Sequence, residues 1–172
     1  MRKRANAAKI AYPAILGAIS LIFVYIASVV PTGNWGLVAI AGLLPAAAVV
    51  SVGLKAGFLC WAGVSILSFL LLPGKFCALL YAALFGLYPM VKSLIERLRR
   101  MSVEYLLKLL FFNAVFTLIY LLMSAAVLDS LPKQLSVTWL LYLVGNVVFL
   151  LYDFGFSKLI GFYIARIGRA VK

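Results

Sequence analysis

The feature that most constrains this chain is a series of six long apolar segments, separated by short polar or turn-forming stretches. A membrane-spanning helix needs about 20 mostly apolar residues, because the hydrocarbon core of a bilayer is about 30 Å thick. The segments that meet this requirement are Ile10–Val30, Trp35–Gly53, Ala56–Leu72, Phe76–Leu94, Val103–Leu128 and Ser136–Ile164. The sequence therefore predicts an all-α, polytopic integral membrane protein, with one domain of six transmembrane helices over residues 1–172.

The composition excludes most other classes of protein. Of the 172 residues, 66% are apolar and 12% are charged, whereas soluble domains average about 45–50% and about 25%. So few polar side chains do not cover the surface of a soluble domain of this length. Soluble enzymes, disordered tails and nucleic-acid-binding modules are excluded on this ground, although the formal net charge is +12.

The basic residues predict the orientation in the membrane. Cytoplasmic loops of membrane proteins carry an excess of Lys and Arg. With both termini inside, fourteen of the sixteen basic residues fall on the cytoplasmic side, and only Lys75 and Lys133 fall outside. We therefore expect an N-in, C-in topology in the cell membrane, with the cytoplasmic membrane of a bacterium as the favoured location.

The sequence contains no recognisable catalytic, nucleotide-binding or metal-binding motif. The chain has no histidine, no phosphate-binding Gly-Lys-Ser/Thr loop and no metal-spaced cluster, which argues against triad, zinc and nucleotide chemistry. Cys60 and Cys77 lie in apolar runs and are expected to be free, buried thiols. The sequence thus predicts a protein that is not an enzyme and that needs no cofactor, metal or nucleic acid.

Small residues mark the first two segments. Ala14 and Ala18 are spaced four apart in the first, and the second has a similar face of Gly36, Ala39, Gly42, Ala46 and Gly53. Small side chains allow membrane helices to approach closely. These faces either pack against each other or dock another membrane subunit. Pro45 is expected to kink the second helix and to free backbone carbonyls.

The last three segments each carry one polar and aromatic stripe at helical spacing. The stripes are Tyr81, Phe85, Tyr88 and Lys92; Asn113, Thr117, Tyr120 and Ser124; and Trp139, Tyr142, Asn146, Phe149 and Asp153. Stripes on neighbouring helices are expected to converge on a shared interior.

Two amides lie near mid-membrane in this prediction. At about 1.5 Å of rise per residue, Asn113 and Asn146 each lie about 15 Å from one end of their segments. An unpaired amide there is costly, so the two side chains bond either each other or a ligand. The hydroxyls and rings above them suit a small solute, although Trp139 and Tyr142 also fit the interfacial aromatic belt. Because no carboxylate lies in the outer half of the stripes, a neutral or anionic solute is favoured.

A polar cluster is expected at the inner end. Asp153 lies within an apolar segment, where Lys92 and Lys108 are at a depth that allows pairing and Glu96 follows Lys92 by one turn. A structural ion pair is favoured over a proton carrier because bases are abundant nearby. The adjoining run from Glu96 to Arg100 is expected to meet anionic headgroups or a cytosolic partner.

The predicted architecture resembles the S component of an energy-coupling factor (ECF) transporter, which is the substrate-binding membrane subunit for micronutrients. The resemblance rests on the length of the chain, the six spans, the cytoplasmic location of both termini and the face formed by Ala14 and Ala18. The resemblance implies solute binding in the outward half by spans four to six and by the loop after span one, which here holds Asn34 and Trp35. It also implies a transmembrane coupling subunit that docks at Ala14 and Ala18, and separate ATPases.

Three functions follow as hypotheses. The leading one is capture of a small, vitamin-like, ring-containing solute for uptake with separate energising subunits. The second is a structural or regulatory membrane protein whose basic cytoplasmic loop recruits lipid or a partner. The third is a small proton-coupled transporter that uses Asp153.

Overall fold

The computed structural model describes the backbone over residues 2–126 and 138–166, and the side chains over residues 10–122, 139–140 and 142–166. The described chain is helical between short connections. The helices are α1 (Arg2–Val29), α2 (Asn34–Ser51), α3 (Leu54–Leu71), α4 (Lys75–Leu80), the π-helix η1 (Tyr81–Phe85), α5 (Tyr88–Ile95), the 3₁₀-helix η2 (Glu96–Leu98), α6 (Met101–Ala126) and α7 (Thr138–Arg166).

Six helical segments in the described residues are long and apolar enough to cross a membrane. They are Ile10–Val29, Asn34–Ser51, Leu54–Leu71, Lys75–Leu98, Met101–Leu122 and Tyr142–Arg166, and the fourth combines α4, η1, α5 and η2. The predicted all-α fold with six spans is therefore confirmed, and the chain is a polytopic membrane protein. The predicted limits at Leu128 and Ser136 lie outside the described residues.

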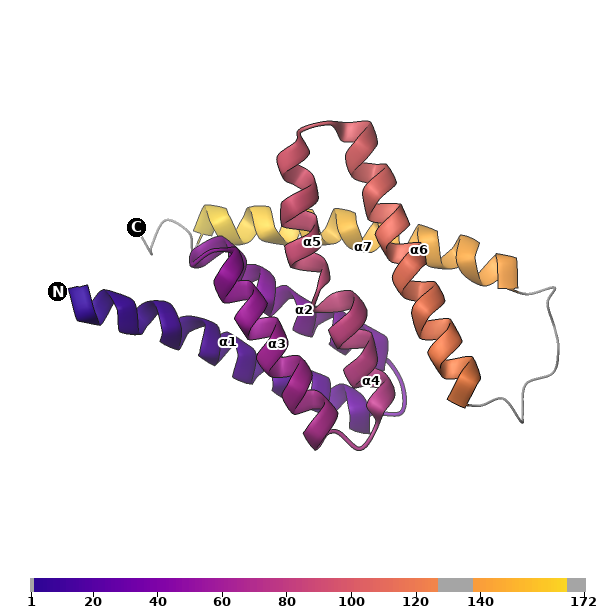
Figure 1. The fold of residues 1–172 in the computed structure, drawn as a ribbon, viewed down its shortest axis with the longest axis horizontal. Coiled ribbons are helices and arrows are strands. Elements are labelled where there is room, and N and C mark those ends of the chain that lie inside the picture. Colours follow the sequence, from indigo (N-terminus) through magenta and orange to yellow (C-terminus); the bar gives the residue numbers. More distant parts are fainter. Residues whose placement is uncertain (1, 127–137, 167–172) are drawn as a thin grey trace.

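The helices alternate between two ends of the molecule (Figure 1). One end holds the start of α1, the α2–α3 connection, the α5–α6 connection and the end of α7. We call it the basic end, because it carries Arg97, Arg99, Arg100 and Arg166. The α1–α2 connection, the α3–α4 connection, the end of α6 and the start of α7 lie at the opposite end.

The fourth span lies at the centre of the molecule. In its most apolar stretch 56% of the residues are buried, against 17% in each of the fifth and sixth spans. Its largest buried side chains are Tyr81 and Tyr88. α6 and α7 consequently present much of their surface outward, as expected for helices in contact with lipid.

The fourth span is not the continuous α-helix that the sequence pattern predicts. Pro89 has no N–H and its ring crowds the carbonyl four residues earlier, which disfavours a regular helix across this position. The chain widens into a π turn, in which the Gly86 N–H donates to the Tyr81 carbonyl at 2.8 Å. The Ala82 carbonyl, which loses its usual partner, accepts a bond of 2.9 Å from the indole N–H of Trp61 on α3. A broken helix is tolerated at membrane depth only with such replacement partners.

α2 approaches the π turn closely, and a glycine makes this possible. A Cβ atom at Gly42 would lie 2.4 Å from the Phe85 carbonyl oxygen. Only a residue without a side chain therefore allows the two backbones to meet. The small face predicted on the second span is thus used for internal packing at this position.

Pro45 frees a carbonyl within α2, as expected from the sequence. α2 continues through Pro45, so the Ala41 carbonyl has no N–H donor four residues later. The hydroxyl of Ser20 on α1 donates to that carbonyl at 3.0 Å and lies 3.1 Å from the Tyr81 hydroxyl. One buried serine thereby joins α1, α2 and the π turn.

Candidate functional site

The two amides near mid-membrane bond each other. Asn113 Nδ2 donates to Asn146 Oδ1 at 2.9 Å, and Asn146 Nδ2 donates to Asn113 Oδ1 at 3.1 Å. Each Nδ2 also donates to the carbonyl four residues earlier, that of Leu109 or Tyr142. Both donors of each amide are therefore used. Of the two possibilities that the sequence left open, the amide clamp between α6 and α7 is the one present.

A hydroxyl pair continues the α6–α7 contact one turn away. Thr117 Oγ1 lies 2.7 Å from the Tyr142 hydroxyl, and it also donates to the Asn113 carbonyl at 2.7 Å. Tyr120 is 41% exposed and Trp139 is 64% exposed, so neither turns toward this contact. The side chain of Ser124 lies outside those described.

A small cavity lies beside the amide clamp, between the fourth, fifth and sixth spans. Its volume is about 100 Å³, and apolar and aromatic side chains line it. They are Phe76, Leu80, Leu84, Phe85, Phe112, Phe116, Ile119, Val148, Phe149 and Tyr152, together with Trp35 and Gly145.

Of the residues that the sequence analysis predicted for ligand binding, Trp35 lines this cavity, as do Phe85 and Phe149 of the predicted stripes. Phe112 and Phe116 each precede a polar residue of the α6 stripe by one position, which rotates them by about 100° around the helix. Phe112 stacks on Phe149 with ring centroids 4.6 Å apart. The rings thus turn into the cavity, and Asn113 and Asn146 pair beside it.

Two residues at the cavity have properties expected of a binding site. The hydroxyl of Tyr152 is buried and has no hydrogen-bond partner in the described structure. Such orphaned groups are rare and require an explanation. Trp35 is 53% exposed and lies 5.9 Å from Phe76 between ring centroids, so it forms part of the rim. Asn34 instead accepts a bond from the Trp35 backbone N–H.

Tyr81 does not join the residues of the fifth and sixth spans. It is fully buried and its hydroxyl contacts Ser20. The expectation that Tyr81 and Tyr88 share one face assumed a continuous α-helix. The π turn adds a wider turn between them, so Tyr81 faces α1 and α2 whereas Tyr88 faces α7.

The polar cluster at the basic end contains the residues that the sequence analysis predicted for it. Lys108 Nζ lies 3.1 Å from Asp153 Oδ2 and 3.1 Å from Glu96 Oε1. Lys92 pairs with Asp153 and also lies 2.9 Å from Glu96 Oε1. Two ammonium groups therefore face two carboxylates, and the cluster is neutral overall.

Two hydroxyl groups complete this cluster. Tyr88 donates to Asp153, and Lys92 donates to Ser157 at 2.8 Å. Asp153, Lys92 and Lys108 are each 5% exposed or less, so these hydrogen bonds replace hydration that burial removes. Ser157 was missed in the sequence analysis, although it follows Asp153 by one turn of the same helix.

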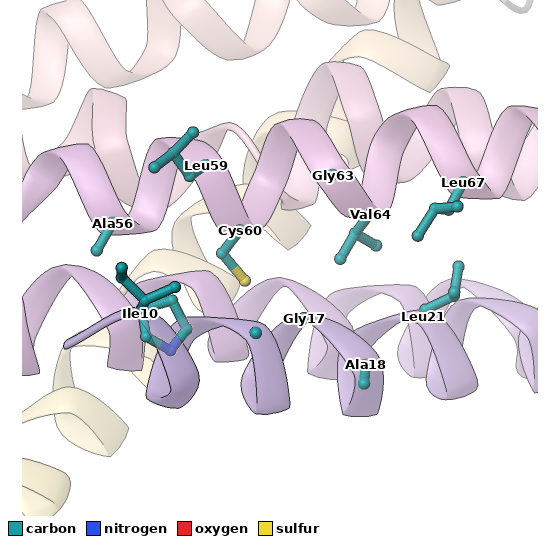
Figure 2. Close-up of a pocket in the computed structure, with 12 residues that line it drawn as sticks. Ile10, Gly17, Ala18, Leu21, Ala56, Leu59, Cys60, Gly63, Val64 and Leu67 are labelled. Carbon is teal, nitrogen blue, oxygen red and sulfur yellow. The ribbon is translucent and has the colours of Figure 1, made fainter. Parts of the chain in front are cut away.

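The small residues predicted for partner docking lie along an open groove between α1 and α3 (Figure 2). The groove has a volume of about 430 Å³ and includes Ala14, Ala18 and Gly63 in its wall. Ala14 and Ala18 are exposed. A Cβ atom added at Gly63 would meet nothing within 4 Å. The two helices meet instead at Gly17, whose Cβ position lies 3.5 Å from Cys60 Sγ.

Comparisons with known proteins return no match: no family model fits the chain, and no curated protein and no solved structure is significantly similar to it.

Proposed function

We propose that this polytopic membrane protein is the solute-binding subunit of a transporter, and that its solute occupies the aromatic cavity between the fourth, fifth and sixth spans. The observations that carry the proposal are the aromatic cavity itself and Tyr152, a residue of its wall whose hydroxyl is buried and has no hydrogen-bond partner in the described structure. Burying such a group without a partner costs about 1–3 kcal/mol. On this proposal the cavity widens when solute binds, and a polar atom of the solute then reaches the hydroxyl and supplies the missing partner.

The cavity defines the class of solute. A cavity of about 150 Å³ lined by apolar side chains accepts benzene, so the cavity of about 100 Å³ here must widen to hold even a single small ring and excludes larger solutes. The described wall contains no charged side chain, which favours an uncharged solute over an anionic one. We therefore expect a neutral, single-ring compound that carries at least one hydrogen-bonding group.

The broken fourth span supports this location. Leu80, Leu84 and Phe85 of α4 and η1 line the cavity, and π turns occur frequently at functional sites. Opening or closing of this segment provides a route for the solute past Trp35. The groove at Ala14 and Ala18 offers a surface for a coupling subunit, and the absence of a phosphate-binding loop in the sequence fits an energy source on separate ATPase subunits.

The test is a thermal-shift screen of the purified protein against neutral single-ring solutes, followed by titration of each hit against Tyr152→Phe and Tyr120→Phe. Y152F removes the unpartnered hydroxyl, so we expect the affinity of the variant for the solute to be about fivefold lower than that of the wild type. Without solute, Y152F is more stable than the wild type by about 1 kcal/mol. Y120F removes an exposed hydroxyl from α6 and changes neither quantity.

A third variant locates the solute. Trp35→Phe abolishes the change in tryptophan fluorescence that accompanies binding, because Trp35 is the tryptophan at this cavity. Equal affinities of the wild type and Y152F for every hit contradict the assigned site. A folded protein that binds none of the solutes contradicts the proposed function.

The exposed basic turn favours a second candidate function, recruitment of a cytosolic partner or lipid in a structural or regulatory role. Arg97, Arg99 and Arg100 are all exposed between α5 and α6. On this alternative, charge reversal of the three arginines abolishes complex formation and Y152F has no effect on it. If the protein binds a solute, Y152F weakens that binding and the charge reversal does not, so the two sets of variants distinguish the two functions.

A further inference from the structure

A second hollow lies at the basic end of the molecule, between α2, α5 and α7. Its volume is about 490 Å³, and it is separate from the aromatic cavity. One side of its wall is polar and basic, and the other side is apolar. Polar and basic groups come from the end of the fourth span: Lys92, Ser93, Glu96, Arg97 and Arg99. Apolar side chains come from α2, α5 and α7: Ala46, Val49, Val50, Pro89, Ile160 and Ile164.

The side chains of this hollow whose charges are not paired within the protein are positively charged. Lys92 and Glu96 are committed to each other and to the buried cluster with Lys108 and Asp153. Arg97 and Arg99 are exposed, and within the described part of the chain neither forms an ion pair. Two guanidinium groups therefore remain available for an anion at the mouth of the hollow. Guanidinium groups bind phosphate oxygens through paired N–H donors.

The apolar side of the hollow continues into a neighbouring one. A hollow of about 350 Å³ between α1, α2 and α7 shares Val50 and Ile160 with the first. The rest of its wall is apolar apart from Tyr163: Leu16, Leu43, Leu44, Ala47, Leu159 and Phe162. An anion that fits the arginines thus has a hydrocarbon-like surface directly beside it, which a free inorganic ion does not use.

We infer that this hollow is a binding site for an anionic phospholipid, whose phosphate headgroup lies between Arg97 and Arg99 and whose acyl chain lies along Val50 and Ile160. The distribution of basic residues predicts that this end faces the cytoplasm, where the membrane surface is negatively charged. Basic pockets between membrane helices on that side suit such headgroups. The site is independent of the solute cavity, so either proposal stands without the other.

The experiment is a titration of the full-length protein in neutral detergent with phosphatidylglycerol, followed by native mass spectrometry. The variants are Arg97→Gln, Arg99→Gln and, as the matched control, Arg100→Gln. Arg100 lies on the same turn and is also exposed, but it does not line the hollow. R97Q and R99Q each weaken binding about fivefold, because one basic residue contributes about 1 kcal/mol near anionic lipid. R100Q stays within about twofold of the wild type.

Two further additives identify the source of the phosphate. Phosphatidylcholine, which has no net charge, binds more weakly than phosphatidylglycerol by a similar factor or more. Inorganic phosphate and glycerol phosphate do not displace the lipid, since neither uses the apolar wall. Displacement by these soluble phosphates overturns the lipid assignment in favour of a free phosphate compound.

Two other results also overturn the proposal. Equal weakening by all three substitutions means diffuse attraction to the basic turn rather than a site. Unchanged binding in R97Q and R99Q, with melting temperatures equal to that of the wild type, removes lipid from this hollow and leaves the arginines to a cytosolic partner.

Discussion

Asp153 is the residue that connects most groups at the basic end. Its two carboxylate oxygens face Lys92 and Tyr88 on one side and Lys108 on the other. These partners come from α5 and α6, whereas Asp153 belongs to α7. The third hypothesis from the sequence assigns proton transfer to this carboxylate. Its position between two ammonium groups favours a structural role, because both stabilise the charged form.

Replacing Asp153 with Asn tests this structural role. The substitution leaves two buried ammonium groups with the single carboxylate of Glu96, and loss of one partner from a buried pair costs about 3–5 kcal/mol. We expect D153N to lower the melting temperature in detergent markedly. Lys158→Gln is the control, because Lys158 is exposed and its ammonium lies over the Phe154 ring at 5.4 Å. A D153N protein with wild-type stability and no transport would instead support the proton-coupled transporter.

At the scale of elements, the π turn of the fourth span is packed between α2 and α3. The turn is held on one side by the Trp61–Ala82 bond from α3 and on the other by the close approach of Gly42 to Phe85. Leu84 and Phe85 of this turn also line the aromatic cavity. Packing at Gly42 is therefore linked to the form of the cavity.

Two glycines of α2 provide a matched pair of substitutions. Gly42→Ala places a methyl group 2.4 Å from the Phe85 carbonyl oxygen, so the helices must separate, at an expected cost of about 1–3 kcal/mol. Gly36→Ala meets nothing within 4 Å, so it leaves stability unchanged or raises it by up to about 1 kcal/mol. Thermal unfolding of both variants measures the difference. Equal stabilities would contradict the close contact between α2 and the π turn.

At the scale of the whole molecule, the six spans place the start of α1 and the end of α7 on the same side (Figure 1). The same end carries the basic turn with Arg97, Arg99 and Arg100. Since positive loops remain in the cytoplasm, the fold and the charge distribution together predict a single orientation.

Cysteine labelling in intact cells measures this orientation. In a C60A/C77A background, Thr32→Cys in the α1–α2 connection should react with a membrane-impermeant maleimide. Arg100→Cys in the α5–α6 connection should react only after the cells are permeabilised. Labelling of Arg100→Cys in intact cells, with Thr32→Cys protected, would show the opposite orientation.

The sequence alone predicts those features that depend on local and regular structure. Six apolar segments of bilayer length specify six helices, because every backbone group must be bonded inside the membrane. On α6 and α7, regular helical spacing places Asn113 beside Asn146 and brings Asp153 to the lysines. These contacts are predictable because an uninterrupted helix keeps its phase from one end to the other.

Contacts between helices determine the remaining features. The sequence contains Pro89 and Gly86, but only the positions of Trp61 and Gly42 on neighbouring helices show that the chain there forms a π turn. That turn rotates Tyr81 away from the stripe to which it was assigned. The predicted ligand-binding residues included the two amides, which pair with each other in the structure, because periodicity does not distinguish a face that pairs with one neighbour from a face that encloses a space. The sequence determined how many helices cross the membrane, and tertiary packing decided which of their faces surround the cavity.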